Sequence, residues 1–237
     1  MQRMLSMQSG KTIGFIGLGN MGLPMAHNFV KNGHDVLCFD TNKDSVDRLV
    51  QLGGRAASSV EAIASSVTTV FSVLPNDEVV TSVVLGDATK PGSGLLANLA
   101  PGTLHVSCST IHPDTSRCLD TKHNEKSASY IAAPIFARPD GMEALQANFV
   151  ISGSNAEAVE IATEWLKCTS AGRLAHQMAL QNQVPMPFLS VLIDRFLSER
   201  AKGRSDLDWS AIGLGVCESR GVDVSDAIER ARKDTKE

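Results

Sequence analysis

The chain has 237 residues, of which 43% are hydrophobic and 20% charged, and its formal net charge is −4. These proportions are typical of a globular protein with one large core, or one domain and a smaller companion, and they exclude a disordered or fibrous chain. Since the net charge is negative and lysine and arginine form no block, no nucleic-acid partner is expected. The longest apolar run, near residues 67–74, is too short to cross a bilayer, so no membrane partner is expected.

Five cysteines are scattered through the chain without C-x-x-C spacing. This pattern argues against a disulfide framework or a zinc site, and it fits a reducing compartment. The first eleven residues lack the apolar centre of a secretory signal. We therefore expect a cytoplasmic protein, with mitochondria as the alternative, and no bound metal.

The first two-thirds of the chain alternates short β-branched runs with stretches of helical period, a pattern typical of βαβ units and a mostly parallel sheet. The expected strands are 12–16, 35–39, 67–73, 103–107, 129–132 and 148–152. The expected helices are 21–32, 43–52, 60–65, 77–85 and 155–167, with a surface loop at 86–94. Beyond about residue 170 only helical spacing remains, at 174–180, 188–201 and 210–220, and the charged residues 223–237 indicate a solvated helix end. We expect a tail at 1–11, an α/β domain at 12–170 and a helical domain at 171–237.

A glycine-rich segment, Gly17-Leu18-Gly19-Asn20-Met21-Gly22, fits G-x-G-x-x-G between the first strand and the first helix. In such a segment the first glycine makes a tight turn, the second lets backbone approach a pyrophosphate, and the third lets helix pack on strand. The helix N-terminus adds N–H groups and a positive dipole end. The segment therefore predicts a dinucleotide site; the alternative is a turn that only packs helix against strand.

An acidic residue, Asp40, ends the second strand 18 residues beyond Gly22. A carboxylate there accepts hydrogen bonds from the ribose hydroxyls of NAD and repels the 2′-phosphate of NADP. NAD is therefore the expected cofactor and NADP the alternative, with Lys43 moderating the preference. The competing interpretation is that Asp40 caps the helix that follows.

Four motifs in order, "GFIGLGNMGLPMA", "VLPNDEVV", "STIHPDTSR" and "AAPIFARPDG", resemble the β-hydroxyacid dehydrogenases. This family includes 3-hydroxyisobutyrate dehydrogenases and tartronate semialdehyde reductases and is related to 6-phosphogluconate dehydrogenase. The similarity covers residues 12–167 and resumes in "VPMPFLSVLIDRF" and "DLDWSAI". It implies a Rossmann-like, doubly wound domain followed by helices, and an enzyme that interconverts a small 3-hydroxy acid and its aldehyde or keto form with NAD(P).

The resemblance also implies roles for individual residues. Leu74 and Pro75 would line the cofactor cleft and Thr110 would lie beside the nicotinamide, although Ser109 and Thr110 could instead cap the helix from Pro113. The substrate segment would contain the residues Pro134, Phe136 and Arg138. The family usually has Ser-Gly-Gly at 136–138; Phe136 cannot donate a hydrogen bond to a substrate carboxylate, whereas Arg138 could pair with one or be a surface arginine.

The segment after Lys167 departs from the family pattern. A glycine-rich turn, a helix with the catalytic lysine and paired asparagines, and a long interdomain helix are expected there, but the chain reads "CTSAGRLAHQMALQNQVPMP". Because the chain departs from the family pattern here, we expect an internal deletion, a shortened helical domain and impaired activity. His176 is a weak candidate for a substitute proton donor, and His112 is an equally weak one. Lys167 is expected to be a solvated cation at a helix end, and Tyr130 is expected in the core.

Two other functions stay open at this point. The chain could be a non-catalytic dinucleotide-binding protein, acting as a homodimer or as a partner subunit in a hetero-oligomer with a full-length relative. It could also reduce imines, because the substrate segment departs from the family pattern at Phe136 and Arg138.

Overall fold

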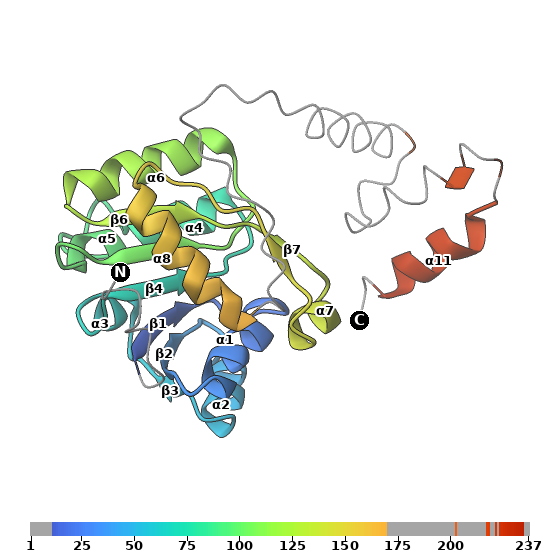
Figure 1. Cartoon of the computed structure of the whole chain (residues 1–237), viewed down its shortest axis with the longest axis horizontal. Coiled ribbons are helices and arrows are strands. Elements are labelled where there is room, and N and C mark those ends of the chain that lie inside the picture. The colour runs from blue at the N-terminus through green and yellow to red at the C-terminus, as the bar shows by residue number, and fades with distance from the viewer. Residues whose placement is uncertain (1–10, 170–201, 203–216, 219–220, 222, 235–237) are drawn as a thin grey trace. The chain divides into compact units, whose positions relative to one another are not determined.

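The computed structural model describes residues 11–169, 202, 217–218, 221 and 223–234. The chain divides into two compact units, Met1–Gln181 and Asn182–Glu237. The first unit contains the α/β fold (Figure 1). In the second unit the described helix is α11 (Ser225–Asp234), and Asp223 Oδ1 accepts from the Ser225 N–H over 3.0 Å just before it.

Six parallel strands form the main sheet, in the order β3-β2-β1-β4-β5-β6. Their bounds are β1 (Thr12–Ile16), β2 (Asp35–Phe39), β3 (Arg55–Ala56), β4 (Thr69–Ser72), β5 (Leu104–Ser107) and β6 (Ser129–Ala132). The winding direction reverses at β1, which lies between β2 and β4. In sheets of this kind, ligands bind outside the carboxyl ends of the strands at the reversal point.

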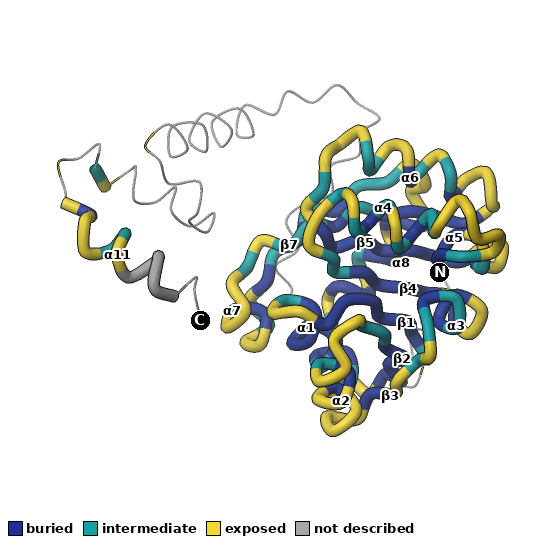
Figure 2. The backbone as a smooth tube through the Cα atoms, turned by 180° about the vertical axis from the view of Figure 1, so that it is seen from behind, coloured by how far each residue is buried: buried dark blue, intermediate teal, exposed yellow. Residues whose placement is uncertain are grey.

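Helices cover both faces of this sheet (Figure 1). One face carries α1 (Gly22–Lys31), α2 (Lys43–Gln51) and α8 (Ala156–Leu166), and the other carries α3 (Val60–Ala64), α4 (Asp77–Leu85), α5 (Leu95–Asn98) and α6 (Pro113–Glu125). Successive residues of a strand enter opposite cores, as Phe15 and Ile16 do. Because both faces are covered, the central strands β1, β4 and β5 are buried along nearly their whole length (Figure 2), whereas the edge strand β3 is exposed.

A small segment, β7–α7–β8, leaves the sheet after β6. It consists of β7 (Ile135–Phe136), α7 (Pro139–Glu143) and β8 (Asn148–Phe149), and β7 pairs antiparallel with β8. Asn28 of α1 donates its side-chain amide to the carbonyl oxygen of Met142 over 2.8 Å, and Met142 is fully buried. The segment is therefore fixed against α1. The 3₁₀ turn η2 (Lys167–Thr169) follows α8.

The expected α/β fold is confirmed, and β1, β2, β6 and α4 have the predicted bounds. The predicted strand at 148–152 is wrong in extent: only Asn148–Phe149 forms a strand, outside the parallel sheet, while Ser152 makes an isolated bridge to Ala132. The predicted helices at 174–180 and 188–201, and most of 210–220, lie outside the described residues; α11 falls in the predicted helix end. Among the described helices, none is long and apolar enough to cross a membrane.

Candidate functional site

The glycine turn begins at Gly17, directly after β1. Its φ angle is +92°, a conformation that side chains rarely adopt, and a Cβ atom there would overlap the carbonyl oxygen of Val73. The Gly17 N–H donates to the Phe39 carbonyl oxygen over 3.0 Å. The turn is therefore wedged between the ends of β2 and β4, and glycine is required there by the fold.

The other two glycines of the turn differ from each other. A Cβ atom at Gly22 would overlap the carbonyl oxygen of Gly17, so the absence of a side chain lets α1 pack against the turn. At Gly19, by contrast, no atom of the described residues other than Gly19 and its two chain neighbours lies within 4 Å of the Cβ position. Nothing in the described fold requires glycine at 19, whereas a pyrophosphate approaching the backbone does.

The N-terminus of α1 has no side-chain cap at Met21 and no acidic residue in its first turn. Five other helices are capped by side chains, at Asn42, Ser59, Asn76, His112 and Asn155. The first N–H groups of a helix need partners, and the positive dipole end favours an anion. The exposed turn before α1 is therefore suited to a phosphate group.

Asp40 connects the turn to the end of β2. Its Oδ2 accepts from the Leu18 N–H over 2.5 Å, and its Oδ1 accepts from the Asn42 N–H over 2.7 Å. Asn42, not Asp40, caps α2, by accepting from the Asp44 N–H over 3.0 Å. A carboxylate has about four lone-pair sites, so Asp40 can still accept ribose hydroxyls beside the turn.

Because β4 and β5 are parallel neighbours, the loops that follow them bring Leu74, Pro75 and Thr110 to the same carboxyl edge of the sheet. Leu74 is half-buried, while Pro75 and Thr110 are exposed. Ser109 is buried, and its Oγ accepts from the Leu74 N–H over 2.8 Å. Ser109 and Thr110 therefore do not cap α6, since His112 does so through Nδ1, 3.2 Å from the Asp114 nitrogen. Proline at the first helical position already marks the preceding residue as the cap.

The predicted substrate residues lie on or next to the β7–α7–β8 segment. The Pro134 carbonyl accepts from the Val150 N–H over 3.4 Å. Phe136 is 39% exposed, and Arg138 is exposed with its Nε 3.5 Å from the Asp140 carboxylate. Because this ion pair is solvent-exposed, it constrains Arg138 only weakly.

The candidate proton donors differ in their position and in their exposure. His176 lies outside the described residues. The Lys167 ammonium lies 2.5 Å from Glu164 Oε1, and both side chains are about half exposed, as expected at a surface helix end. His112 is exposed at the start of α6, and Tyr130 is buried in the core.

A buried chain of hydrogen bonds that includes two histidines could not be recognised from the sequence. Ser72 Oγ lies 2.9 Å from His105 Nε2, His105 Nδ1 lies 3.1 Å from His123 Nε2, and His123 Nδ1 lies 2.7 Å from the Leu119 carbonyl oxygen. The pKa of His105 is lowered well below its usual value, mainly by burial and to a smaller extent by the neighbouring His123. Burial also lowers the pKa of His123. The pair thus stays neutral and connects β4, β5 and α6.

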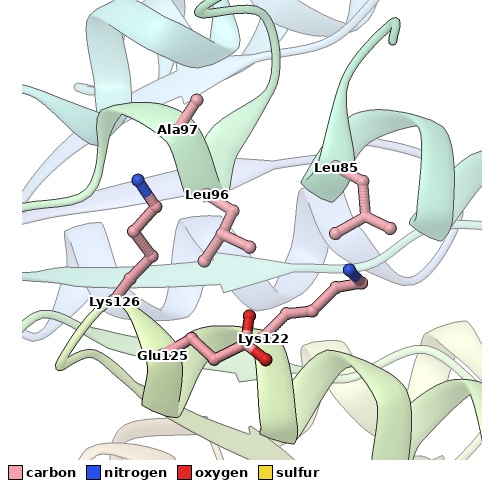
Figure 3. Close-up of a pocket in the computed structure, with 6 residues that line it drawn as sticks. All are labelled: Leu85, Leu96, Ala97, Lys122, Glu125 and Lys126. Carbon is pink, nitrogen blue, oxygen red and sulfur yellow. The ribbon is translucent and has the colours of Figure 1, made fainter.

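A shallow pocket of about 300 Å³ lies elsewhere, at the C-terminal ends of α4 and α6 (Figure 3). Its lining is Leu85, Leu96, Ala97, Lys122, Glu125 and Lys126. Since the helices run antiparallel to the strands they connect, their C-terminal ends lie at the opposite edge of the sheet from the glycine turn. The pocket is therefore separate from the candidate site. Within the described part of the chain, no group of three or more histidine, cysteine or acidic side chains could hold a metal ion.

Comparison with protein families gives a match to the NAD binding domain of 6-phosphogluconate dehydrogenase over residues 12–179. A probable mitochondrial 3-hydroxyisobutyrate dehydrogenase of Dictyostelium discoideum is 33% identical over 166 residues, which are 70% of this chain and 50% of that protein. An NAD-dependent L-serine dehydrogenase of Pseudomonas aeruginosa is 39% identical over 150 residues, 63% of this chain and 48% of that protein. The chain spans about half the length of these relatives.

Solved structures share the fold. A 3-hydroxyisobutyrate dehydrogenase of Mycobacterium tuberculosis with L-serine superposes with a TM-score of 0.66 at 23% identity, covering 82% of this chain and 67% of that one. An imine reductase from Myxococcus stipitatus in complex with NAD+ gives a TM-score of 0.66 at 17% identity, covering 95% of this chain and 71% of that one. These likenesses, together with the family match, confirm the Rossmann-like fold and the resemblance described above.

Proposed function

Because the chain belongs to the family of the NAD binding domain of 6-phosphogluconate dehydrogenase, we propose that it is an NAD-dependent oxidoreductase of the 3-hydroxy acid dehydrogenase type. The observation that carries the proposal is the open space at Gly19 beside an uncapped helix N-terminus. A turn that served only to pack α1 against β1 would need Gly17 and Gly22 but not Gly19.

The residues fit a nicotinamide dinucleotide along the carboxyl edge. In this assignment the backbone from Gly17 to Gly22 binds the pyrophosphate and Asp40 binds the adenosine ribose, while Leu74, Pro75 and Thr110 line the nicotinamide end. When bound, the cofactor accepts or donates the hydride. The Asp40 charge repels a 2′-phosphate, which favours NAD over NADP.

The substrate is proposed to be a small 3-hydroxy acid. Arg138 is exposed at the start of α7, and a guanidinium can bind a carboxylate through two parallel hydrogen bonds. Its partner Asp140 lies at 3.5 Å in solvent, so exchange for a substrate carboxylate costs little. Phe136 would supply an apolar wall in place of the usual hydrogen-bond donors.

The proposed site lacks the lysine that transfers the proton in the family. The family lysine has no counterpart in the sequence after Lys167, and His176 is a weak replacement. Loss of a general acid or base lowers the rate by roughly 10²–10⁴-fold. We therefore expect slow turnover with dinucleotide binding retained.

An activity assay tests the proposal. Purified protein would be incubated with NAD and a panel of 3-hydroxy acids that includes 3-hydroxyisobutyrate and L-serine, and NADH formation recorded. Gly19→Ala is the matched control, since the described fold leaves room for its methyl group. NADH formed by the wild type and not by Gly19→Ala supports the proposal. Oxidation of NADPH or NADH with cyclic imines, but not with aldehydes, would favour imine reduction instead.

A second candidate is a non-catalytic dinucleotide-binding subunit. The missing lysine motif together with the retained Gly17, Gly19, Gly22 and Asp40 favours it. Binding of NADH without turnover, and co-purification with a full-length relative, would support this role. A partner-free monomer that turns over a 3-hydroxy acid would exclude it.

A further inference from the structure

Two loops at the carboxyl edge are joined by reciprocal hydrogen bonds. From the loop after β5, the Ser109 side chain reaches the backbone after β4 and accepts from the Leu74 N–H over 2.8 Å. From the start of α4, the Asp77 side chain reaches the backbone of the β5–α6 loop and accepts from the His112 N–H over 2.9 Å. We call these two contacts the loop clasp.

The loop clasp continues the pairing of the strands. Just before it, the Cys108 N–H donates to the Ser72 carbonyl oxygen over 2.8 Å, at the end of β4. The Thr115 side chain in the first turn of α6 also contributes to lowering the pKa of Asp77. Three hydrogen bonds thus connect the β4–α4 and β5–α6 loops, so these loops are held as one unit.

Thr110 lies between the two contacts of the loop clasp. Ser109, immediately before it, is only 5% exposed, and His112, two residues later, is held through its backbone N–H. Thr110 itself is exposed. The clasp therefore fixes the backbone on either side of Thr110 and leaves its side chain accessible at the carboxyl edge of the sheet.

The strand order indicates where the nicotinamide end would bind. If the turn after β1 held the pyrophosphate and Asp40 after β2 held the adenosine ribose, the loops after β4 and β5, on the other side of β1, would hold the nicotinamide end. We propose that Ser109 and Asp77 are positioning residues that hold Leu74 and Thr110 for the nicotinamide end of the cofactor. This inference rests on the proposed function.

The physical reason is the conformational entropy of the loops. A loop that is already ordered loses less freedom when it binds a ligand, and the affinity is correspondingly higher. Breaking one clasp contact frees the segment around Thr110 and leaves the glycine turn and Asp40 in place. Ligands that contact only the adenosine and pyrophosphate sites are therefore unaffected by the clasp.

The test compares NADH with ADP-ribose, which lacks the nicotinamide. Ser109→Ala and Asp77→Ala each remove one clasp contact, Asp77→Asn keeps an oxygen acceptor, and Glu78→Ala removes the neighbouring charge from the same helix turn. Dissociation constants would be measured by calorimetry. We expect the two alanine variants at Ser109 and Asp77 to bind NADH about fivefold more weakly and ADP-ribose within about twofold of wild type. Asp77→Asn and Glu78→Ala should remain close to wild type for both ligands.

The outcomes separate this inference from the proposed function. Equal weakening of both ligands, or none, overturns the positioning role while dinucleotide binding stands. A wild type that binds neither ligand overturns both. Asp77 is only partly buried, so its variants provide the test even where Ser109→Ala fails to fold.

Discussion

The backbone nitrogen of Leu18 lies 2.5 Å from the Oδ2 atom of Asp40, so the glycine turn after β1 is joined to the carboxylate that ends β2. The same carboxylate accepts from the Asn42 N–H over 2.7 Å. Two parts of the candidate site, for pyrophosphate and for ribose, are therefore one structural unit. A change at Asp40 should alter both the shape of the turn and the choice of cofactor.

Replacing Asp40 by Asn tests this double role. An amide offers one oxygen and one NH₂ group to two N–H donors, so one donor loses its acceptor. The free energy of unfolding should therefore fall by about 1–3 kcal/mol. Loss of the charge also removes the repulsion of a 2′-phosphate, so the NADPH-to-NADH ratio of dissociation constants should fall by about tenfold. Asp44→Asn, which neutralises an exposed acid in the first turn of α2, is the control. An unchanged ratio in Asp40→Asn would remove Asp40 from cofactor selection.

The glycines at 19 and 22 should respond in opposite ways to alanine. At Gly22 the added methyl group overlaps the Gly17 carbonyl, and overpacking of this kind costs about 1–3 kcal/mol of stability. At Gly19 it meets nothing in the described structure, so the melting temperature should stay near that of wild type while dinucleotide binding is lost. Thermal unfolding and calorimetric titration of both variants provide the measurement. Normal NADH binding by Gly19→Ala would contradict the assignment of the open space.

The buried histidine pair should have one fixed arrangement of protons. The Leu119 carbonyl can only accept, so His123 Nδ1 carries a proton; in the neutral ring His123 Nε2 then accepts from His105 Nδ1–H. His105 Nε2 in turn accepts from the Ser72 hydroxyl. Both rings should therefore be Nδ1–H tautomers, which hydrogen–nitrogen correlation NMR can identify. An Nε2–H signal from either ring would disprove this order.

The same pair should make stability depend on pH. Because burial lowers the folded-state pKa of His105 and His123, the unfolded chain binds more protons below the ordinary pKa of 6.5. Their contribution is complete above that pH and is lost as pH falls through the lowered folded-state pKa values. The melting temperature should thus decline from about pH 7 to about pH 5. Replacing both buried histidines by glutamine should reduce this decline, and the lowered pKa values of His27 and His34 account for part of what remains. His112→Asn, which removes an exposed histidine and keeps a capping side chain, is the matched control.

Much of the α/β unit could be predicted from the sequence, because buried parallel strands and amphipathic helices have strong periodic signals. Strands β1, β2 and β6, for example, have the predicted bounds. The β7–α7–β8 segment could not be placed in this way, because two-residue strands and a five-residue helix are too short to show a period. Its position depends on tertiary contacts such as that between Asn28 and Met142.

The candidate site was predictable where a local motif determines it and not where distant contacts do. The roles of Gly17 and Gly22 follow from the spacing of the turn. The contact from Asp40 back to Leu18, and that from Ser109 to Leu74, join residues 22 and 35 positions apart. The link between His105 and His123 likewise requires β5 and α6 to be packed together. Such contacts exist only in the folded chain.

Thermal unfolding of the purified chain with NADH, NADPH or no ligand tests the central claim, that the turn and Asp40 bind NAD(H). A ligand at a hundred times its dissociation constant adds about 2.7 kcal/mol to native stability, which raises the melting temperature of a chain of this size by roughly 5–10 °C. We predict such a rise with NADH, a smaller one with NADPH, and none in Gly19→Ala. A cooperative wild-type transition that neither cofactor moves would contradict the account.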